Sequence, residues 1–467
     1  MKRFAAFLLT LAVVLSIMPA VSFADTFDPN SITSPNVLLM DASSGAVLFE
    51  KNARTRAYPA STTKIMTCIL ALENCPDLDV VVTIGDNVET KGSRMKFSRG
   101  EQLTLRALIY GMMLNSGNDA AKAIAEHISG SESAFAELMN QKAASLGMTG
   151  THFVKPNGLH NDDHYSTAYD MAILTRYALQ NEEFRTIVAA ETYQVPPTNK
   201  DSDGYLLENT NKLIHTKDTD EQSYKYSYAT GVKTGDTNEA GRCLVASAKK
   251  NGVELIAVIF GDPQGSKGAN LRFTNSVSLF EWGFENYASL DAAALGLEAE
   301  FTFSISGAED VTEITAHANL TGAYITDTKE KIAAIQANPA AITAQTALSG
   351  KVEAPIAAGD VIGTVAYQYE SATLFSVDLI ADQDVAAAAV EATPNPSANP
   401  LFVDTPGVEH GDADKGSPWL FWLLIAVVVL IVILVVRGIA AKRRRRRLAR
   451  RRRAYRANYN VQSRPRR

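Results

Sequence analysis

Three short clusters in this chain combine residue types that can carry out nucleophilic chemistry. A serine hydroxyl and a lysine amine three residues apart can act as nucleophile and base, and a serine with an asparagine can relay a proton and bind an amide. A lysine beside a threonine can bind a carboxylate. The set predicts serine acyl transfer on a substrate with a terminal carboxylate. In chain order the clusters are Ser61-Thr-Thr-Lys64, Ser116-Gly-Asn118 and Lys233-Thr-Gly235.

The position of Ser61 distinguishes it from the other serines that are followed by a lysine. Apolar residues recur at helical spacing after Ser61 until Cys75-Pro76, which predicts a buried helix that begins near Ser61. Because residues three apart share a helix face, the Lys64 amine should reach the Ser61 hydroxyl. The same spacing at Ser247 follows a strand-like run, where residues three apart point to opposite faces, and at Ser93 it lies in a charged stretch typical of a solvated loop.

Lys64 can act as a base only when it is neutral. Its pKa must then fall from about 10.4 to roughly 7, and burial or a nearby second cation lowers a lysine pKa in this way. The apolar helix predicts burial, and Lys233 is the candidate second cation. The alternative is an ordinary helix lysine with a buried stem and its amine in water. The presence of the other two clusters favours the base.

The second and third clusters are predicted to lie at structural boundaries. An apolar helical pattern over 103–114 stops before a new one over 120–128, so Ser116 and Asn118 should occupy a tight turn, where they could also act as a helix cap. Strand-like segments at 229–235, 242–248 and 253–260 place Lys233 and Thr234 on the edge of an antiparallel sheet. Gly235 would leave room for a substrate backbone to approach that strand.

From about residue 35 to residue 284 the sequence resembles the low-molecular-mass penicillin-binding proteins, the serine D-alanyl-D-alanine carboxypeptidases of peptidoglycan. The resemblance implies an α/β (α+β) fold of the penicillin-recognising serine transpeptidase and β-lactamase type, with an antiparallel sheet flanked by helices. It extends beyond the three clusters to further stretches, which are Pro59-Ala-Ser-Thr-Thr-Lys-Ile-Met66, Leu114-Asn-Ser-Gly-Asn-Asp-Ala-Ala121, Phe153-Val-Lys-Pro-Asn-Gly-Leu159, Asn209-Thr-Asn-Lys-Leu213 and Gly231-Val-Lys-Thr-Gly-Asp-Thr237.

The same resemblance implies a role for each site residue. Ser61 would be acylated with Lys64 as the base, and the backbone N–H groups of Ser61 and Asp236 would form the oxyanion hole. The other implied roles are proton transfer and amide contacts for Ser116 and Asn118, and binding of the terminal carboxylate by Lys233, Thr234 and, from its spacing to Trp282-Gly-Phe284, Arg272. Asp236 and Asn157 stand where some family members have a histidine, so no deacylation role is transferred to them.

The two ends of the chain predict export and membrane anchoring. Residues 1–24 have the basic start, the apolar run and the Ser22-Phe-Ala24 cleavage site of a signal peptide. Residues 418–437 contain an aliphatic stretch that would span about 27 Å as a helix. Residues 437–467 carry fifteen Lys and Arg and no acidic residue. The positive-inside rule therefore places the tail, 438–467, in the cytoplasm and the catalytic domain outside it. Basic residues next to a transmembrane helix indicate contact with anionic lipid headgroups more than binding of nucleic acid.

Between these ends we expect a catalytic domain over 25–290, a small β-rich domain over 291–390 and a linker over 391–417. This exported part carries 28 basic and 51 acidic residues, a formal charge near −23, which argues against nucleic-acid binding. Cys68, Cys75 and Cys243 are expected to be small buried residues, because two helical turns separate the first two. His160 and His164 are expected to be loop residues with no metal.

The expected activity is removal of the terminal D-alanine from peptidoglycan stem pentapeptides through an acyl-enzyme, with β-lactams as inhibitors and no cofactor. One alternative is a class A-like β-lactamase. Against it stand Ser116-Gly-Asn118 in place of Ser-Asp-Asn and the position of Glu137, whose Glu-x-x-Asn pattern comes only nineteen residues after Asn118. A second alternative is a catalytically silent wall-binding protein, which the intact clusters disfavour.

Overall fold

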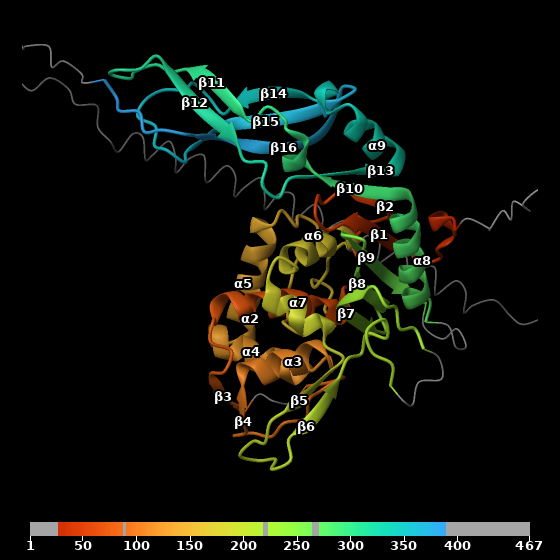
Figure 1. Ribbon diagram of the computed structural model, residues 1–467. Coiled ribbons are helices and arrows are strands. Elements are labelled where there is room, and N and C mark those ends of the chain that lie inside the picture. Colours follow the sequence, from red (N-terminus) through yellow and green to blue (C-terminus); the bar gives the residue numbers. More distant parts are fainter. Residues whose placement is uncertain (1–26, 87–89, 218–222, 264–269, 389–467) are drawn as a thin grey trace, which may run out of the picture. The chain divides into compact units, whose positions relative to one another are not determined.

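A five-stranded antiparallel sheet forms the centre of the part that carries the three clusters (Figure 1). The computed structural model describes residues 27–86, 90–217, 223–263 and 270–388. The strand order is β2-β1-β9-β8-β7, so β7 is an edge strand, as the sequence predicts. The bounds are β1 Asn36–Asp41, β2 Val47–Lys51, β7 Ala229–Thr237, β8 Gly241–Lys250 and β9 Val253–Asp262.

An apolar core covers each face of this sheet. Successive side chains along a strand point to opposite faces, so each strand contributes to both cores. In β1, Leu38 and Met40 join one apolar core while Val37 and Leu39 join the other. Helix α8, Leu271–Asn286, packs on β8 and β9 and closes the second core (Figure 1). The first core contains helix α2, Lys64–Asn74, which holds the lysine of the first cluster in the middle of the domain.

The helix that begins near Ser61 differs in its first turn from the prediction. Residues Ala60–Thr63 form a 3₁₀ turn, η2, and the α-helix α2 starts only at Lys64. The predicted helix over 103–114 is also shorter, because Gln102–Thr104 pairs as strand β4 and the Thr104 hydroxyl then caps α3 by accepting from the Ala107 N–H. The bounds of the other helices here are η1 Pro29–Ser31, α3 Leu105–Met113, α4 Asn118–Ser129, α5 Glu132–Ser145, α6 Ala168–Ala178 and α7 Glu182–Ala189.

Three two-stranded sheets and a second five-stranded sheet complete the described strands. The strand pairs are β3 Val81–Thr83 with β4, β5 Thr192–Val195 with β6 Tyr205–Glu208, and β10 Tyr287–Asp291 with β13 Tyr324–Thr328. The second five-stranded sheet has its own apolar core, around Val365 and Tyr367, and the order β11-β12-β16-β15-β14. The remaining bounds are η3 Ala292–Leu295, β11 Glu300–Ser304, β12 Glu313–Ala318, α9 Lys329–Ala337, η4 Pro339–Ala341, β14 Thr343–Leu348, β15 Val361–Tyr369 and β16 Ala372–Ala381.

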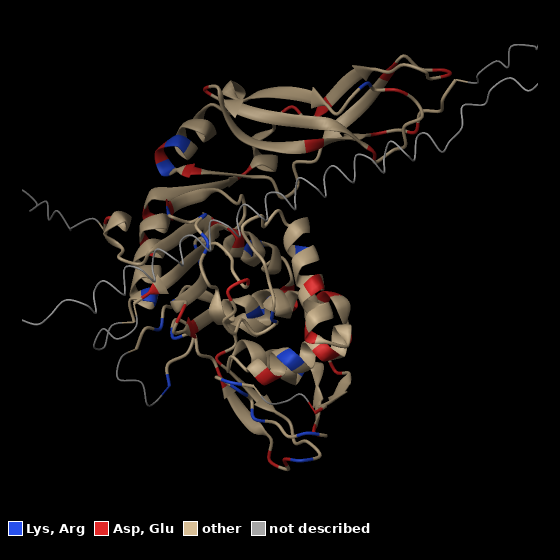
Figure 2. Cartoon of the chain, turned by 180° about the vertical axis from the view of Figure 1, so that it is seen from behind, with Lys and Arg blue, Asp and Glu red and all other residues tan. Residues whose placement is uncertain are grey.

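The predicted signal peptide, linker, membrane span and tail lie outside the described residues. Within the described ranges, every helix is too short or too polar to cross a bilayer. Figure 2 shows positions of acidic and basic residues interspersed along the helices and loops of the chain.

The three cysteines are free thiols. Cys68 and Cys243 are buried as predicted, and burial raises the pKa of both, in the case of Cys243 to about 12. Thiols with such pKa values are poor nucleophiles at neutral pH. Cys75 differs from the prediction, because it ends α2 and is only partly buried, with its Sγ 3.8 Å from Nε2 of His127.

Candidate active site

The Lys64 amine is the centre of a buried set of polar contacts. Its Nζ lies 2.8 Å from Ser61 Oγ, 2.7 Å from Asn118 Oδ1 and 2.7 Å from the backbone oxygen of Asn157. The side chain is fully buried at the start of α2. The structure thus brings the first and second clusters together around one nitrogen.

Burial is the main reason why the pKa of Lys64 lies well below its usual value, and the Lys233 cation lowers it further. The Asp119 carboxylate opposes this effect only in part. A neutral lysine has two N–H donors and one lone pair. The oxygens of Asn118 and Asn157 can only accept, so they take the two N–H groups and leave the lone pair for the Ser61 hydroxyl. This arrangement suits a base that removes the serine proton.

The second cluster lies where a loop enters α4. Ser116 is buried and has a φ of +58°, a backbone conformation that residues other than glycine seldom adopt. Ala60, the residue before the first cluster's serine, also has a positive φ, of +47°. Strained backbone of this kind is often retained where it positions reactive groups. Asn118 is the first residue of α4 and not part of the preceding turn, which is a small correction to the prediction.

The segment 91–96 holds this second cluster in place. The Asn118 Nδ2 donates to the Lys91 oxygen and the Asn118 N–H to the Ser93 oxygen. The Asp119 carboxylate accepts from the N–H groups of Met95 and Lys96. The segment is a loop, as predicted, but its backbone is a support for the site and Met95 is buried.

The third cluster lies on the edge strand β7 beside the 3₁₀ turn that holds Ser61. Lys233 is buried, and burial together with the Arg272 cation lowers its pKa to about 7. Gly235 is required for a close approach of the chain to itself, because a Cβ at this position would lie 3.0 Å from the Pro59 oxygen and 3.1 Å from the Ser61 nitrogen. The backbone of Ser61 therefore faces the strand that also carries Asp236, which is exposed.

Arg272, on α8, contacts the backbone of the neighbouring strands β7 and β8. Its Nη1 donates to the Gly235 oxygen at 2.9 Å and to the Cys243 oxygen at 3.1 Å. Its Nε is buried and has no hydrogen-bond partner within the described ranges. Burial lowers the pKa of Arg272, and Asp236 partly offsets that change. The Arg272 cation is near enough to Lys233 to lower its pKa, and its Nη1 hydrogen bonds go to backbone carbonyls.

Thr210 connects the second and third clusters, and the sequence analysis assigns it no role. Its N–H donates to the Leu114 oxygen at 3.1 Å, two residues before Ser116, and its Oγ1 lies 2.9 Å from Thr234 Oγ1. The stretch 209–213 contributes to the family resemblance, but a threonine between two asparagines is equally common in ordinary turns. Its role in joining the second and third clusters becomes visible only from its contacts with Leu114 and Thr234.

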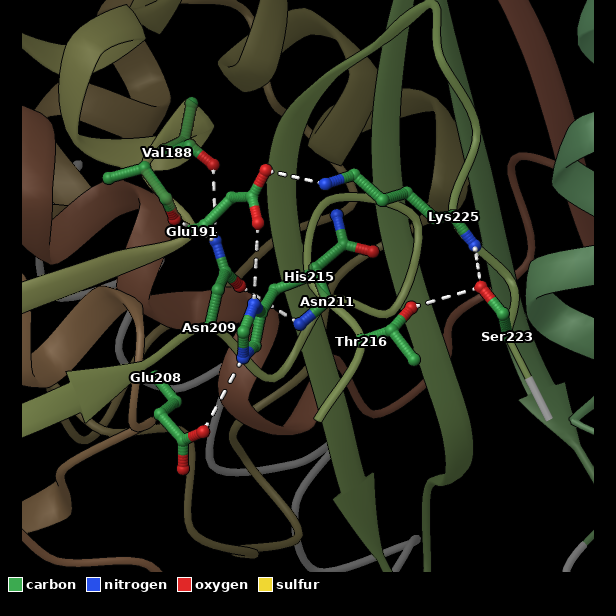
Figure 3. Close-up of polar contacts among 10 residues, drawn as sticks. Val188, Glu191, Glu208, Asn209, Asn211, His215, Thr216, Ser223 and Lys225 are labelled. Carbon is green, nitrogen blue, oxygen red and sulfur yellow. Dashed lines mark hydrogen bonds and ion pairs between the residues drawn. The ribbon is translucent and has the colours of Figure 1, made fainter. Parts of the chain in front are cut away.

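The turn that carries Thr210 is fixed on both sides by amide side chains. Asn209 donates to the Val188 oxygen (Figure 3) and to the Ala190 oxygen. Asn211 donates to the Gly231 oxygen at 2.9 Å.

A charged group supports the same turn from the next residues along the chain. His215 lies within 3.5 Å of the carboxylates of Glu191 and Glu208, and the Lys225 amine donates to Glu191 at 2.6 Å (Figure 3). The Lys217 amine donates to Glu208 at 2.7 Å. The threonine contact to β7 is therefore built on a braced loop.

His164 lies in a loop, as expected, but it is buried and joins two segments of the site. It is almost fully buried, and burial lowers its pKa to about 3, so the ring is neutral. Its Nε2 lies 2.9 Å from Thr63 Oγ1 and its Nδ1 accepts from the Val154 N–H. This histidine fastens the loop that carries Asn157 to the turn that carries Ser61. His160 lies in the same loop, as expected, close to Asp162.

Two protein-family models match this chain. A family model described as D-alanyl-D-alanine carboxypeptidase, peptidase S11, matches residues 23–264. A second model, described as penicillin-binding protein 5, C-terminal domain, matches residues 328–387.

Individual relatives agree with these matches. The chain is 33% identical to the D-alanyl-D-alanine carboxypeptidase DacA of Haemophilus influenzae, over 78% of this chain and 88% of that protein. It is 40% identical to DacF of Bacillus subtilis over 48% of this chain, and that match spans 57% of the Bacillus protein. The crystal structure of penicillin-binding protein 5 from Haemophilus influenzae superimposes with a TM-score of 0.61 at 32% identity, covering 77% of this chain and 99% of that one.

Proposed function

Because the chain belongs to the peptidase S11 family of serine D-alanyl-D-alanine carboxypeptidases, we propose that Ser61 is the nucleophile and Lys64 the base of that reaction. The observation that carries this proposal is the position of the buried Lys64 amine, 2.8 Å from Ser61 Oγ and held by two obligate acceptors. The substrate we propose is the peptidoglycan stem pentapeptide.

The proposed reaction proceeds in two steps on the same serine. Neutral Lys64 takes the Ser61 proton as Oγ attacks the carbonyl of the penultimate D-alanine, and the N–H groups of Ser61 and Asp236 stabilise the oxyanion. The bond to the terminal D-alanine breaks, and its nitrogen leaves with a proton relayed through Ser116. Water then hydrolyses the acyl-serine ester and restores the hydroxyl. A β-lactam carbonyl is attacked in the same way, which opens its ring and leaves the serine acylated.

The terminal carboxylate of the substrate would lie against Lys233 and Thr234, with the positive charge of Arg272 behind them. Asn118 would contact the substrate amide through the side chain that already binds Lys64. Glu137, on which the β-lactamase alternative depends, is exposed on α5, so we do not assign it a role in hydrolysis.

Release of D-alanine from a diacyl-Lys-D-Ala-D-Ala peptide by the purified full chain tests the proposed function directly. We expect catalytic turnover and its loss after preincubation with a β-lactam. Absence of free D-alanine from a chain that binds penicillin would contradict the carboxypeptidase assignment for this protein.

The activity should have a bell-shaped pH profile, because Lys64 must be neutral and Lys233 protonated. The pKa of Lys64 is lowered, so kcat/KM should rise with pH as this amine loses its proton. The pKa of Lys233 is about 7, so binding of a free carboxylate should weaken as pH rises above that value. A substrate analogue that ends in an amide instead of a carboxylate makes no such contact with Lys233. The pH profile of kcat/KM for this analogue should therefore lack the fall at high pH. An identical alkaline limb for both substrates would refute carboxylate binding by Lys233.

Replacing Thr210 with valine should lower kcat/KM for the free-carboxylate substrate by about tenfold, the effect of losing one hydrogen bond of about 1–1.5 kcal/mol. The backbone hydrogen bond to Leu114 remains in the variant. The decrease in kcat/KM therefore comes from the Thr234 hydroxyl, which loses its hydrogen bond to Thr210. Thr210→Ser keeps the hydroxyl and serves as the control. Steady-state kinetics on the acid and the amide distinguish positioning from a general defect, since a general defect would lower both equally.

We further propose that the enzyme acts outside the cytoplasm while anchored in the membrane. Support comes from composition: the signal-peptide pattern over 1–24, the apolar stretch within 418–437 and the basic tail over 438–467. The β-rich domain over 291–390 and the linker over 391–417 would separate the catalytic domain from the bilayer.

A chain truncated after Asp414 should be secreted in soluble, active form, because every proposed site residue precedes position 273. Protease added to intact spheroplasts should digest the catalytic domain of the full chain and leave a C-terminal tag intact. Digestion of the tag with protection of the catalytic domain would reverse the orientation and rule out this proposal.

A further inference from the structure

A cleft of about 720 Å³ opens where β7 ends, beyond the proposed catalytic serine. One wall is formed by Arg56, Ala57 and Tyr58, which lead directly into the turn that carries Ser61. The facing walls come from the loop 162–165 and from the turn 238–241 between β7 and β8. The cleft is therefore bordered by segments that also build the active site, yet it contains none of the residues proposed for acyl transfer.

The direction of the substrate leads to this cleft. If the terminal carboxylate lies at Lys233 and Thr234 and the scissile carbonyl at Ser61, which faces Gly235, the rest of the peptide continues alongside Asp236 and Thr237. Strand geometry gives about 10 Å from Gly235 to Asn238, at roughly 3.3 Å per residue. That distance is within reach of the side chain of the residue that precedes the D-alanyl-D-alanine pair.

The walls of the cleft are fixed by contacts between them. Ala57 and Ser166 exchange backbone hydrogen bonds of 2.8 and 2.9 Å, which ties the segment before Ser61 to the end of the facing loop. The Arg56 guanidinium lies 4.0 Å from the centre of the Tyr165 ring. The Tyr58 ring meets His160 edge to face, with 4.7 Å between ring centres. An aromatic lining on a braced backbone provides a preformed site.

The charges in the cleft select the kind of group that fits. Carboxylates outnumber cations among the lining side chains by four to one. Asp262 is buried and accepts a hydrogen bond from the Ser34 hydroxyl. Asp162, Asp163 and Glu239 are exposed and can face a ligand. A cationic side chain would be attracted here, whereas an acylated, neutral one would gain nothing from these carboxylates.

We propose that this cleft binds the side-chain ammonium of the diamino-acid residue that precedes D-alanyl-D-alanine in the substrate. The inference rests on the proposed function, because it takes the substrate direction from it. It makes the enzyme selective for stem peptides whose side-chain amine is free over those whose amine is acylated. Exposed carboxylates contribute modestly, so the preference should be about three- to tenfold at low salt and smaller at high salt.

Two peptides that differ only at the side-chain amine test the proposal on the purified full chain. One is Nα-acetyl-Lys-D-Ala-D-Ala with a free ε-amine, and the other carries an ε-acetyl group. We expect the ratio of their kcat/KM values to favour the free amine in the wild type. In the double variant Asp162→Asn/Glu239→Gln the ratio should fall clearly below the wild-type value, because only Asp163 of the three exposed carboxylates remains. Glu137→Gln removes an exposed charge on α5 and, as the matched control, should keep the wild-type ratio.

The possible outcomes distinguish the proposed ammonium binding in the cleft from the proposed carboxypeptidase activity. Equal kcat/KM values for the two peptides in the wild type, or a wild-type ratio in the double variant, would overturn the proposal while the carboxypeptidase assignment stands. Release of D-alanine from neither peptide would contradict the assignment itself. Loss of the preference in Glu137→Gln as well would show that overall charge, and not this cleft, selects the amine.

Discussion

Replacing Ser61 with alanine should abolish both labelling by a fluorescent penicillin and release of D-alanine. The reason is that this hydroxyl lies 2.8 Å from the Lys64 amine, and the Ser61 backbone lies close to Gly235 on the edge strand. Without the oxygen no acyl-enzyme can form, so labelling measured after gel electrophoresis should fall to background. The fold should survive, since Ser61 is only partly buried and alanine fits the same turn.

The other two serines with a lysine three residues later provide the controls. Ser247 is buried on β8 and its hydroxyl lies 2.7 Å from Thr230 Oγ1, while the Lys250 amine donates to Glu281. Ser93→Ala and Ser247→Ala should therefore label normally if they fold. An adduct mapped by peptide mass spectrometry to either serine, or normal labelling of Ser61→Ala, would show that the nucleophile has been misassigned.

Replacing Lys64 with arginine should slow acylation by roughly 10²- to 10⁴-fold, the usual contribution of a general base. Arginine keeps its proton at any accessible pH, so it has no lone pair for the Ser61 hydroxyl. The larger guanidinium also has to fit a site where the amine is fully buried between three oxygens. Stopped-flow acylation by a chromogenic β-lactam measures the rate.

Two controls make this result interpretable. Lys122→Arg, on α4 and paired with Glu132, preserves a surface ion pair and should leave the acylation rate unchanged. Thermal unfolding of Lys64→Arg shows whether the variant is folded, because a buried permanent charge destabilises the native state. A folded Lys64→Arg protein that is acylated at the wild-type rate would refute the assignment of the base.

The sequence is sufficient to predict three of the five strands of the central sheet and the neighbourhood of Ser61 and Lys64, whereas β1 and β2 are not predicted. Period-two and period-3.6 patterns depend only on local residues, and the three strands after residue 229 are confirmed with bounds shifted by a few residues. The turn at Ser61 is 3₁₀ and not α, but residues three apart are neighbours in both helix types. The contact between the two side chains therefore does not depend on this error.

Contacts between distant segments could not be predicted from local patterns. Asn157 reaches Lys64 through a backbone oxygen, which any residue type could supply. Thr210 and His164 act by joining loops far apart in the sequence, and no spacing rule identifies such residues. The roles of the site residues, the domain boundaries and the membrane topology remain predictions, and the experiments above address the roles and the topology.

The three oxygens around the Lys64 amine come from separate parts of the chain: the 3₁₀ turn, the start of α4 and a loop that His164 fastens. No single segment can hold the amine in its reactive state, so a partly folded molecule should be chemically silent even when Ser61 is accessible. Stoichiometric labelling by penicillin would then count native molecules only. Because β9 and β8 follow β7 in the chain and join it to β1, the protein would be inert toward acyl donors until the chain has folded through β9, and penicillin labelling would measure how much of it has matured.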